Sequence, residues 1–175
     1  MPDEPGIQDS FRCFLLTISS RDIGGHFELT IFAVDDKGTP VKILINDFRP
    51  LFFIPRSLSP ALAPGVERVA LPLKTLDGCD VDCLYFPTNE LCRSTARILR
   101  QSGIPVYESD ISPADRYLTE RFVKGGFEAQ GRARLVGNLI HLHNPRIRGA
   151  DVSPRLRQMS LDIETNAKTG EIYSI

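Results

Sequence analysis

Apolar and polar positions alternate along much of the first half of the chain, with the two-residue period of β-strands. β-Branched and aromatic residues concentrate in four segments that predict strands, at 11–18, 26–34, 41–46 and 51–54. The sequence Asp-Asp-Lys-Gly at 35–38 predicts a hairpin turn between the second and third of them. The first half of the chain is therefore expected to be mainly β-sheet.

The hydrophobic period changes after residue 80. Residues 81–86 predict a further strand, and residues 89–101 have a helical period with Thr88 as the N-cap and Gly103 as the stop. The apolar stripe of this helix consists of Leu91, Cys92, Ala96, Ile98 and Leu99. A strand at 104–108 would complete a β-α-β unit, which normally has parallel strands and a right-handed crossover.

A second helix is predicted to begin at Ser112. The serine is a suitable N-cap, Pro113 suits the first helical position, and Asp115 adds negative charge to the first turn. Two or three short strands are expected between residues 127 and 143. Together with the first half, this predicts a mixed α+β domain over residues 1–145.

The last thirty residues differ from this domain. Residues 146–157 contain proline and glycine but little apolar content, and they are expected to be a linker. In the sequence Met-Ser-Leu-Asp-Ile-Glu at 159–164, a strand would bury Leu161 and Ile163 and turn Asp162 and Glu164 to its other face. A turn at 166–170 would make this strand part of a hairpin, so residues 158–175 are expected to begin another domain.

Composition is that of an ordinary globular protein, with 42% hydrophobic and 25% charged residues in 175. No apolar run has the length of a bilayer span, and the first ten residues lack the pattern of a signal peptide, so a cytoplasmic location is expected. In a reducing compartment the four cysteines, Cys13, Cys79, Cys83 and Cys92, are expected to be buried thiols. Their spacing does not match a zinc site.

The net charge of −1 conceals a basic stretch. Between residues 116 and 157, nine basic and three acidic residues leave a net charge of +6. A stretch of this charge can neutralise several phosphates of a nucleic acid, although a solvated basic surface is the simpler alternative.

Asp162 and Glu164 are candidate metal ligands. Two residues apart on a strand, their backbones would be roughly 6.6 Å apart, so that both carboxylates could reach one or two hard cations. Carboxylate oxygens suit Mg²⁺ or Mn²⁺, which act in pairs in two-metal phosphoryl chemistry. Two solvated acids on an exposed strand are the competing interpretation.

Other side chains could bind a metal or nucleic acid. His141 and His143 share a face of a predicted strand, where a polar edge is favoured over half of a metal site. Several phenylalanines could stack on bases, but at strand spacing they are expected in the core: Phe11, Phe27, Phe32, Phe52 and Phe53.

Two blocks of sequence together resemble the family B DNA polymerases. The first, Val-Tyr-Glu-Ser-Asp-Ile-Ser-Pro-Ala-Asp-Arg-Tyr-Leu-Thr-Glu-Arg-Phe-Val at 106–123, is similar to the end of that family's N-terminal domain, in the form found in its bacterial members. The second, Met-Ser-Leu-Asp-Ile-Glu-Thr at 159–165, is similar to the first motif of its 3′–5′ proofreading exonuclease. The resemblance covers residues 106–175. It implies a template-side N-terminal domain, followed by the first hairpin of a ribonuclease H-like exonuclease domain.

The resemblance assigns roles to particular residues. Asp162 and Glu164 would be exonuclease acids that hold Mg²⁺ or Mn²⁺ in a full-length enzyme. In this segment alone the site is incomplete, and no metal is expected to bind. Tyr107, Asp110, Arg116 and Tyr117 would be architectural, with an Asp–Arg pair among them. The basic stretch would contact template DNA, with four arginines favoured as phosphate contacts: Arg132, Arg134, Arg146 and Arg148.

The expected function is that of the N-terminal portion of a DNA-directed DNA polymerase in replication and repair. The expected partners are template and primer–template DNA, the remainder of the polymerase chain, and a sliding clamp bound through other regions; no membrane partner is expected, and the location would be cytoplasmic and nucleoid-associated. The later exonuclease and polymerase motifs are absent from the sequence, so this segment alone is expected to be inactive. The alternative is an independent module that binds single-stranded nucleic acid.

Overall fold

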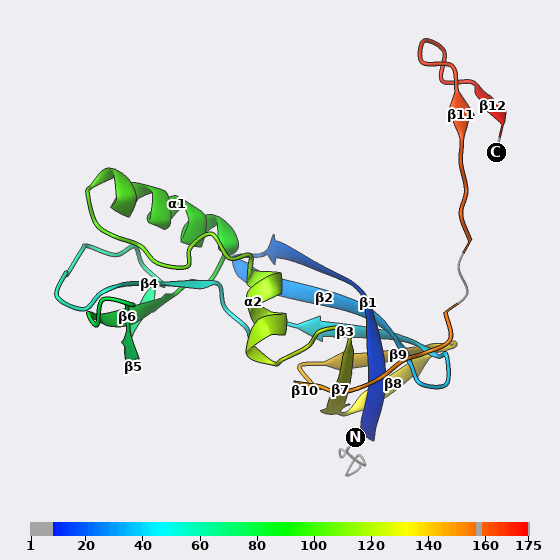
Figure 1. The fold of residues 1–175 in the computed structure, drawn as a ribbon, viewed down its shortest axis with the longest axis horizontal. Helices are drawn as coiled ribbons and strands as arrows, with labels where there is room; N and C mark the ends of the chain where they lie inside the picture. The colour runs from blue at the N-terminus through cyan, green and yellow to red at the C-terminus, as the bar shows by residue number, and fades with distance from the viewer. Residues whose placement is uncertain (1–8, 157–158, 175) are drawn as a thin grey trace.

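The computed structural model describes residues 9–156 and 159–174. Figure 1 shows a larger sheet, a smaller sheet with the long helix α1 beside it, the short helix α2 between the two, and a C-terminal segment that extends away from both. The predicted mixed, sheet-rich α+β architecture is confirmed.

The larger sheet has seven strands in the order β10-β7-β1-β2-β3-β9-β8. Every neighbouring pair is antiparallel except β3 and β9, which are parallel. Its strands are β1 (Asp9–Ile23), β2 (His26–Asp35), β3 (Pro40–Ile45), β7 (Gly126–Gly131), β8 (Ala133–Val136), β9 (Leu139–His143) and β10 (Arg146–Gly149). The predicted turn lies between β2 and β3, where the Asp35 carboxylate accepts hydrogen bonds from the backbone N–H groups of Lys37 and Thr39.

The connections bring the two ends of this sheet together. One residue, Arg132, joins β7 to β8, and Asn144 and Pro145 join β9 to β10. Because consecutive Cα atoms are about 3.8 Å apart, β7 and β10 at one end of the strand order must lie close to β8 and β9 at the other. The sheet is therefore strongly curled, with an apolar inner face and an outer face.

The inner face forms the main core. Alternate residues of β2 and β3 are fully buried there, among them Ile31 and Ile43. Helix α2 (Pro113–Glu120) contributes Tyr117, whose ring meets Phe48 edge to face at 5.3 Å. Ser112 caps this helix as predicted, with its Oγ accepting a hydrogen bond from the backbone N–H of Asp115.

The smaller sheet has the order β4-β6-β5 and carries α1. Its elements are β4 (Leu51–Pro55), β5 (Glu67–Lys74), β6 (Asp80–Tyr85) and α1 (Asn89–Gln101). Cys92, Ala96 and Leu99 of α1 are buried against Phe52 and Leu84, while the predicted stripe residue Ile98 is 57% exposed. Thr88 is the N-cap, as predicted.

The predicted β-α-β unit is wrong. Residues 104–108 do not form a strand, and their one bridge, Tyr107 with Phe53 of β4, is antiparallel. Pro105 lacks the N–H that a strand in this position would donate to its neighbour, and Glu108 has a φ of 58°, which turns the chain towards α2.

Two expectations near the C-terminus also need correction. Residues 146–149 of the expected linker form β10, because Ile147 packs into the core while its neighbours face solvent. Leu161 and Ile163 are not buried but 63% and 53% exposed, and only Glu164–Thr165 (β11) forms a strand, paired with β12 (Ile172–Ser174). The predicted hairpin exists, but within the described chain nothing covers the apolar side of the segment before it.

Candidate nucleic-acid interface

Strand register determines which side chains share the outer face of the seven-stranded sheet. Residues that pair across neighbouring strands point to the same face, so the position of one residue places its partners. Arg12 pairs with Glu128 and Glu128 with Arg148, at one end of the strand order. Towards the other end of the strand order, Phe32 pairs with Lys42, Lys42 pairs with His141, and His141 pairs with Arg134. All these residues lie opposite the buried inner face.

Three of the four predicted phosphate-binding arginines lie on this face. Arg134, Arg146 and Arg148 are exposed on β8 and β10, while Arg132 is exposed in the connection between β7 and β8. Because these strands come from the two ends of the curled sheet, the four arginines gather where its ends approach each other. The four arginines therefore share one location on the larger sheet.

Arg148 is partly neutralised by a neighbour. Its Nε and Nη2 both donate hydrogen bonds to Oε2 of Glu128, at 2.9 and 2.5 Å, and Ser10 and Gln130 donate to Oε1 of the same carboxylate. These hydrogen bonds from Ser10, Arg148 and Gln130 lower the pKa of Glu128 to about 2. In contrast, no ion pair within the described residues engages Arg134 or Arg146, so their charge remains available to an anion.

Sequence reasoning missed Arg12 and Lys42. Arg12 is exposed on β1 and donates a hydrogen bond to the backbone carbonyl of Asp151, and Lys42 lies on β3 with its Nζ 5.8 Å from the Phe32 ring centroid. Both precede the basic stretch by more than seventy residues. The alternation of β1 and β3 indicates which of their residues face outwards, but only the pairing of β1 with β7 and of β3 with β9 brings them to the later arginines.

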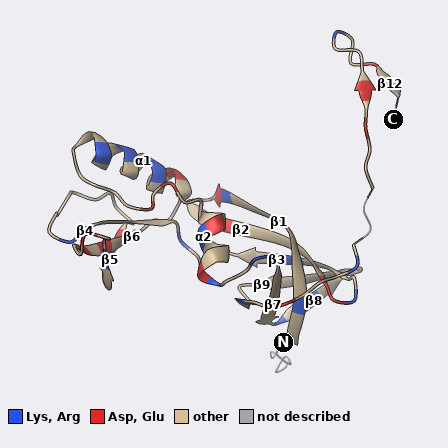
Figure 2. Cartoon of the chain, in the orientation of Figure 1, with Lys and Arg blue, Asp and Glu red and all other residues tan. Residues whose placement is uncertain are grey.

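A second set of basic residues lies on α1, where Figure 2 shows blue positions along the helix. Arg93, Arg97 and Arg100 are exposed on a face beside the buried stripe, and Arg100 donates a hydrogen bond to the Ser109 hydroxyl. Because they are four and three residues apart, the sequence alone predicts that they share one polar face of the helix. They are not part of the outer face of the larger sheet.

The predicted architectural residues lie where the two sheets meet. Tyr117 is 2% exposed, with the Arg121 guanidinium 3.7 Å from its ring centroid, and burial raises its pKa to about 12. Tyr107 makes two backbone hydrogen bonds with Phe53 of β4. The expected pair with Asp110 is not formed: Arg116 contacts the carboxylates of Glu108 at 2.8 Å and Glu120 at 3.7 Å instead.

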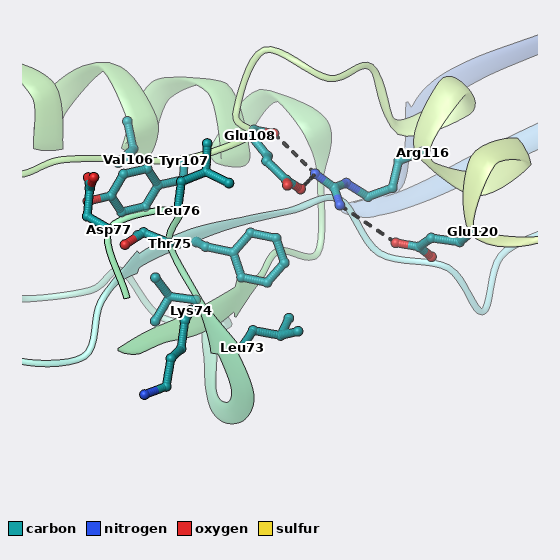
Figure 3. Close-up of a pocket in the computed structure, with 12 residues that line it drawn as sticks. Leu73, Lys74, Thr75, Leu76, Asp77, Val106, Tyr107, Glu108, Arg116 and Glu120 are labelled. Carbon is teal, nitrogen blue, oxygen red and sulfur yellow. Dashed lines mark hydrogen bonds and ion pairs between the residues drawn. The ribbon is translucent and has the colours of Figure 1, made fainter. Parts of the chain in front are cut away.

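Arg116 also lines a cavity of about 770 Å³, shown in Figure 3. Its guanidinium lies 5.7 Å from the ring centroid of Phe53, and the tip of the β5–β6 hairpin forms the opposite wall with Leu73 and Leu76. Arg116 is only 8% exposed, and its buried charge is balanced by ion pairs with Glu108 and Glu120. This arrangement explains a structural role for the arginine, in joining α2 to the segment after α1.

Asp162 and Glu164 are exposed on the extended C-terminal segment, away from both sheets (Figure 1). The structure does not bring either carboxylate near the arginines of the larger sheet. Among the described residues, no group of three or more His, Cys, Asp or Glu side chains could hold a metal ion. The two carboxylates are hard oxygen donors of the type that Mg²⁺ and Mn²⁺ prefer, so their chemistry fits those ions.

The histidines and cysteines take ordinary positions. His141 and His143 lie on the outer face of β9, on the same side as predicted. Cys13, Cys83 and Cys92 are buried, and burial raises their thiol pKa values to about 12, 11 and 12, whereas Cys79 is exposed. Thiols with raised pKa are poor nucleophiles, so the three buried cysteines are packing residues.

Neither helix in the described part of the chain has the length and apolar character of a membrane span.

No protein-family model matches the chain. Among solved structures, the chain is similar to the family B DNA polymerase from the hyperthermophilic archaeon Pyrobaculum calidifontis, with a TM-score of 0.61 and 23% identity. The match covers 82% of this chain and 21% of the archaeal chain. At this identity the likeness shows the fold, which is that of part of a family B DNA polymerase.

Among curated proteins, the chain is similar to DNA polymerase II of Escherichia coli strain K12. The two are 29% identical over 174 residues, which cover 93% of this chain and 21% of the relative. The chain therefore spans about a fifth of the length of the curated relative that it matches. The resemblance to family B DNA polymerases noted in the sequence is confirmed by both comparisons.

Proposed function

We propose that this chain is the template-side, N-terminal portion of a family B DNA polymerase of the polymerase II type. The observation that carries the proposal is the similarity to DNA polymerase II along 93% of the chain, on a fold shared with a family B enzyme. Residues 1–149, which include β10, would be the template-side domain, 150–157 its link to the next domain, and 158–175 the start of a 3′–5′ exonuclease domain. The larger protein would act in replication and repair, in the cytoplasm.

Within this portion, the outer face of the larger sheet would contact DNA through phosphates. Arg132, Arg134 and Arg146 are exposed, and Arg12 and Lys42 extend the basic surface beyond the predicted stretch. Phosphate contacts fix the position of a nucleic acid without reading its sequence, which suits a domain that must accept any template.

Asp162 and Glu164 would supply two of the carboxylates of the exonuclease site. They would bind Mg²⁺ or Mn²⁺ together with acids from other segments of the larger protein, and the ions would activate water and stabilise the leaving oxygen when bound. Two exposed carboxylates on a short hairpin make a weak site by themselves. The chain alone is therefore expected to neither trim nor extend a primer.

DNA binding by the chain tests the first part of the proposal. Single-stranded and primer–template oligonucleotides should bind weakly, and affinity should fall steeply between low and high salt as counterions are released. An affinity that does not change with salt would contradict phosphate contact by this surface. The second candidate is an independent single-strand-binding module, for which the open basic face is the supporting observation. Such a module would also bind the single-stranded overhang of a primer–template, so the coding sequence that follows residue 175, with or without further exonuclease and polymerase motifs, distinguishes the two candidates.

A further inference from the structure

One row of side chains crosses four strands of the outer face without interruption. Phe32 of β2, Lys42 of β3, His141 of β9 and Arg134 of β8 are successive register partners, on strands that Figure 1 shows beside one another. Because neighbouring strands are about 4.8 Å apart, the row spans about 14 Å. Phe32 and His141 are 109 positions apart in the chain (141 − 32), and only the fold brings the row together.

Phe32 is the unusual member of this row. It is 40% exposed, whereas Phe27 on the same strand is 2% exposed, so it contributes little to the core. Lys42 lies with its Nζ over the Phe32 ring, 5.8 Å from the ring centre, so a cation accompanies this exposed aromatic side chain. An exposed aromatic ring on a sheet, bordered by cations, is the arrangement on which proteins stack unpaired bases.

The charges of this face favour a polyanion. Arg134 and Lys42 lie in the row itself, and register places Glu28 and Glu128 on the same face outside it. Each of these acids is held by an arginine, Glu28 by Arg21 at 2.6 Å and Glu128 by Arg148 at 2.5 Å. Among the described residues, therefore, no acidic side chain of this face forms an ion pair with Lys42 or Arg134.

We propose that this row is a platform for single-stranded nucleic acid, on which Phe32 stacks against an unpaired base while Lys42 and Arg134 contact the flanking phosphates. The inference rests on the proposed function, and it makes that function more specific: the surface binds bases as well as phosphates. A duplex is a poorer occupant, since its bases are stacked on one another and do not offer a free face to Phe32.

A fluorescent reporter at residue 32 can test for stacking, because the chain contains no tryptophan. In Phe32→Trp, titration with oligothymidine should quench the emission of the single indole. Leu76→Trp is the matched control, since Leu76 is fully exposed at the tip of the β5–β6 hairpin on the other sheet. Its emission should remain unchanged in the same titration.

Affinity measurements separate stacking from phosphate contact. Phe32→Leu, which keeps an apolar side chain at an exposed position, should weaken oligothymidine binding about five-fold or more without changing the salt dependence. Arg134→Gln should reduce the salt dependence. An oligonucleotide of abasic sites should bind the unaltered chain as weakly as oligothymidine binds Phe32→Leu, and thermal unfolding of each variant checks its fold.

The outcomes distinguish the inference from the function on which it rests. If oligothymidine binds with strong salt dependence but Phe32→Leu and the abasic oligonucleotide change nothing, contact is through phosphates alone and the platform is wrong, while the proposed function stands. If the unaltered chain does not bind DNA at any salt concentration, the proposed DNA contact itself fails.

Discussion

At the scale of single residues, two carboxylates, Asp82 and Glu128, form ion pairs with arginines in different surroundings. Asp82 of β6 has a side chain only 8% exposed, and its two oxygens accept hydrogen bonds from Arg56 at 2.7 Å and Arg68 at 2.8 Å. Arg56 and Arg68 also donate to backbone carbonyls, so this cluster ties together the strands and the loop of the smaller sheet. Glu128, by contrast, lies on the outer face that we propose contacts DNA, where its charge offsets that of Arg148.

Asp82→Asn should destabilise the protein by about 2 kcal/mol, because an amide cannot accept charge-assisted hydrogen bonds from both arginines. Hydrogen bonding by Arg56 lowers the pKa of Asp82, so its contribution is complete above the unfolded pKa of about 4 and is lost as the pH falls through the folded pKa. Thermal unfolding at pH 7 and pH 3 should therefore show a smaller difference between variant and original chain at pH 3. An equal difference at both pH values would contradict this explanation.

Glu128→Gln should have opposite effects on stability and on DNA binding. The pKa of Glu128 is lowered to about 2 by its hydrogen bonds, so its stabilising contribution is present above about pH 5 and is lost towards pH 2. The variant should thus have a flatter acid-unfolding profile. At pH 7 it should bind DNA more tightly, since Arg148 loses its counter-charge; weaker binding would show that Glu128 itself contacts the ligand.

At the scale of elements, β10 and α2 depend on a close approach of two backbones. The Gly149 N–H donates to the Arg121 carbonyl at 2.7 Å, and a Cβ on Gly149 would lie 2.1 Å from the carbonyl oxygen of Phe122. This contact connects the block at 106–123 with the end of the strand that carries Arg146 and Arg148. It supports the architectural interpretation of that block.

Gly149→Ala should therefore destabilise the protein by more than about 2 kcal/mol, because backbone atoms cannot move aside as a flexible side chain could. Gly137→Ala is the matched control. Unlike Gly149, Gly137 has a positive φ, 63°, but no atom lies within 4 Å of the added methyl group, so its cost should be about 1 kcal/mol. Denaturant unfolding compares the two, and equal losses would mean that the contact with Phe122 contributes little.

The sequence predicted the helices and strands themselves better than the pairing between strands. The strands predicted between residues 11 and 54 and at 81–86, the two helices and both N-caps were confirmed, because alternation and capping are local properties. Residues 104–108 were misassigned because apolar content there reflects packing against α1 rather than strand pairing. The outer face could be predicted only in part: the late arginines are a visible cluster, whereas Arg12, Phe32 and Lys42 join them through pairings of strands distant in sequence.

At the scale of the whole molecule, the C-terminal hairpin is separate from the two sheets, and its apolar residues are exposed. Met159, Leu161 and Ile163 are 81%, 63% and 53% exposed. An extended segment with one apolar and one acidic side needs a packing partner before its carboxylates are held in place. We expect this partner to come from the rest of an exonuclease domain.

In a longer protein that contains the complete exonuclease domain, Asp162→Ala with Glu164→Ala should abolish trimming of a 3′ end and leave primer extension intact. If the two carboxylates bind the ions as we propose, their loss removes the ions on which hydrolysis depends. A gel assay of a labelled primer, with and without nucleotides, measures both activities. Normal trimming by the double variant would refute the assignment of this motif.

The central claim, that the outer face of the larger sheet contacts DNA, is tested most directly by the salt dependence of binding. For single strands the slope of log affinity against log salt is about −0.7 for each phosphate contacted, so Arg134→Gln with Arg146→Gln should reduce its magnitude by about 1.4. Arg93→Gln with Arg97→Gln removes the same charge from α1 and should leave the slope unchanged. Equal slopes for all three proteins, or a reduction confined to the α1 variant, would contradict the account.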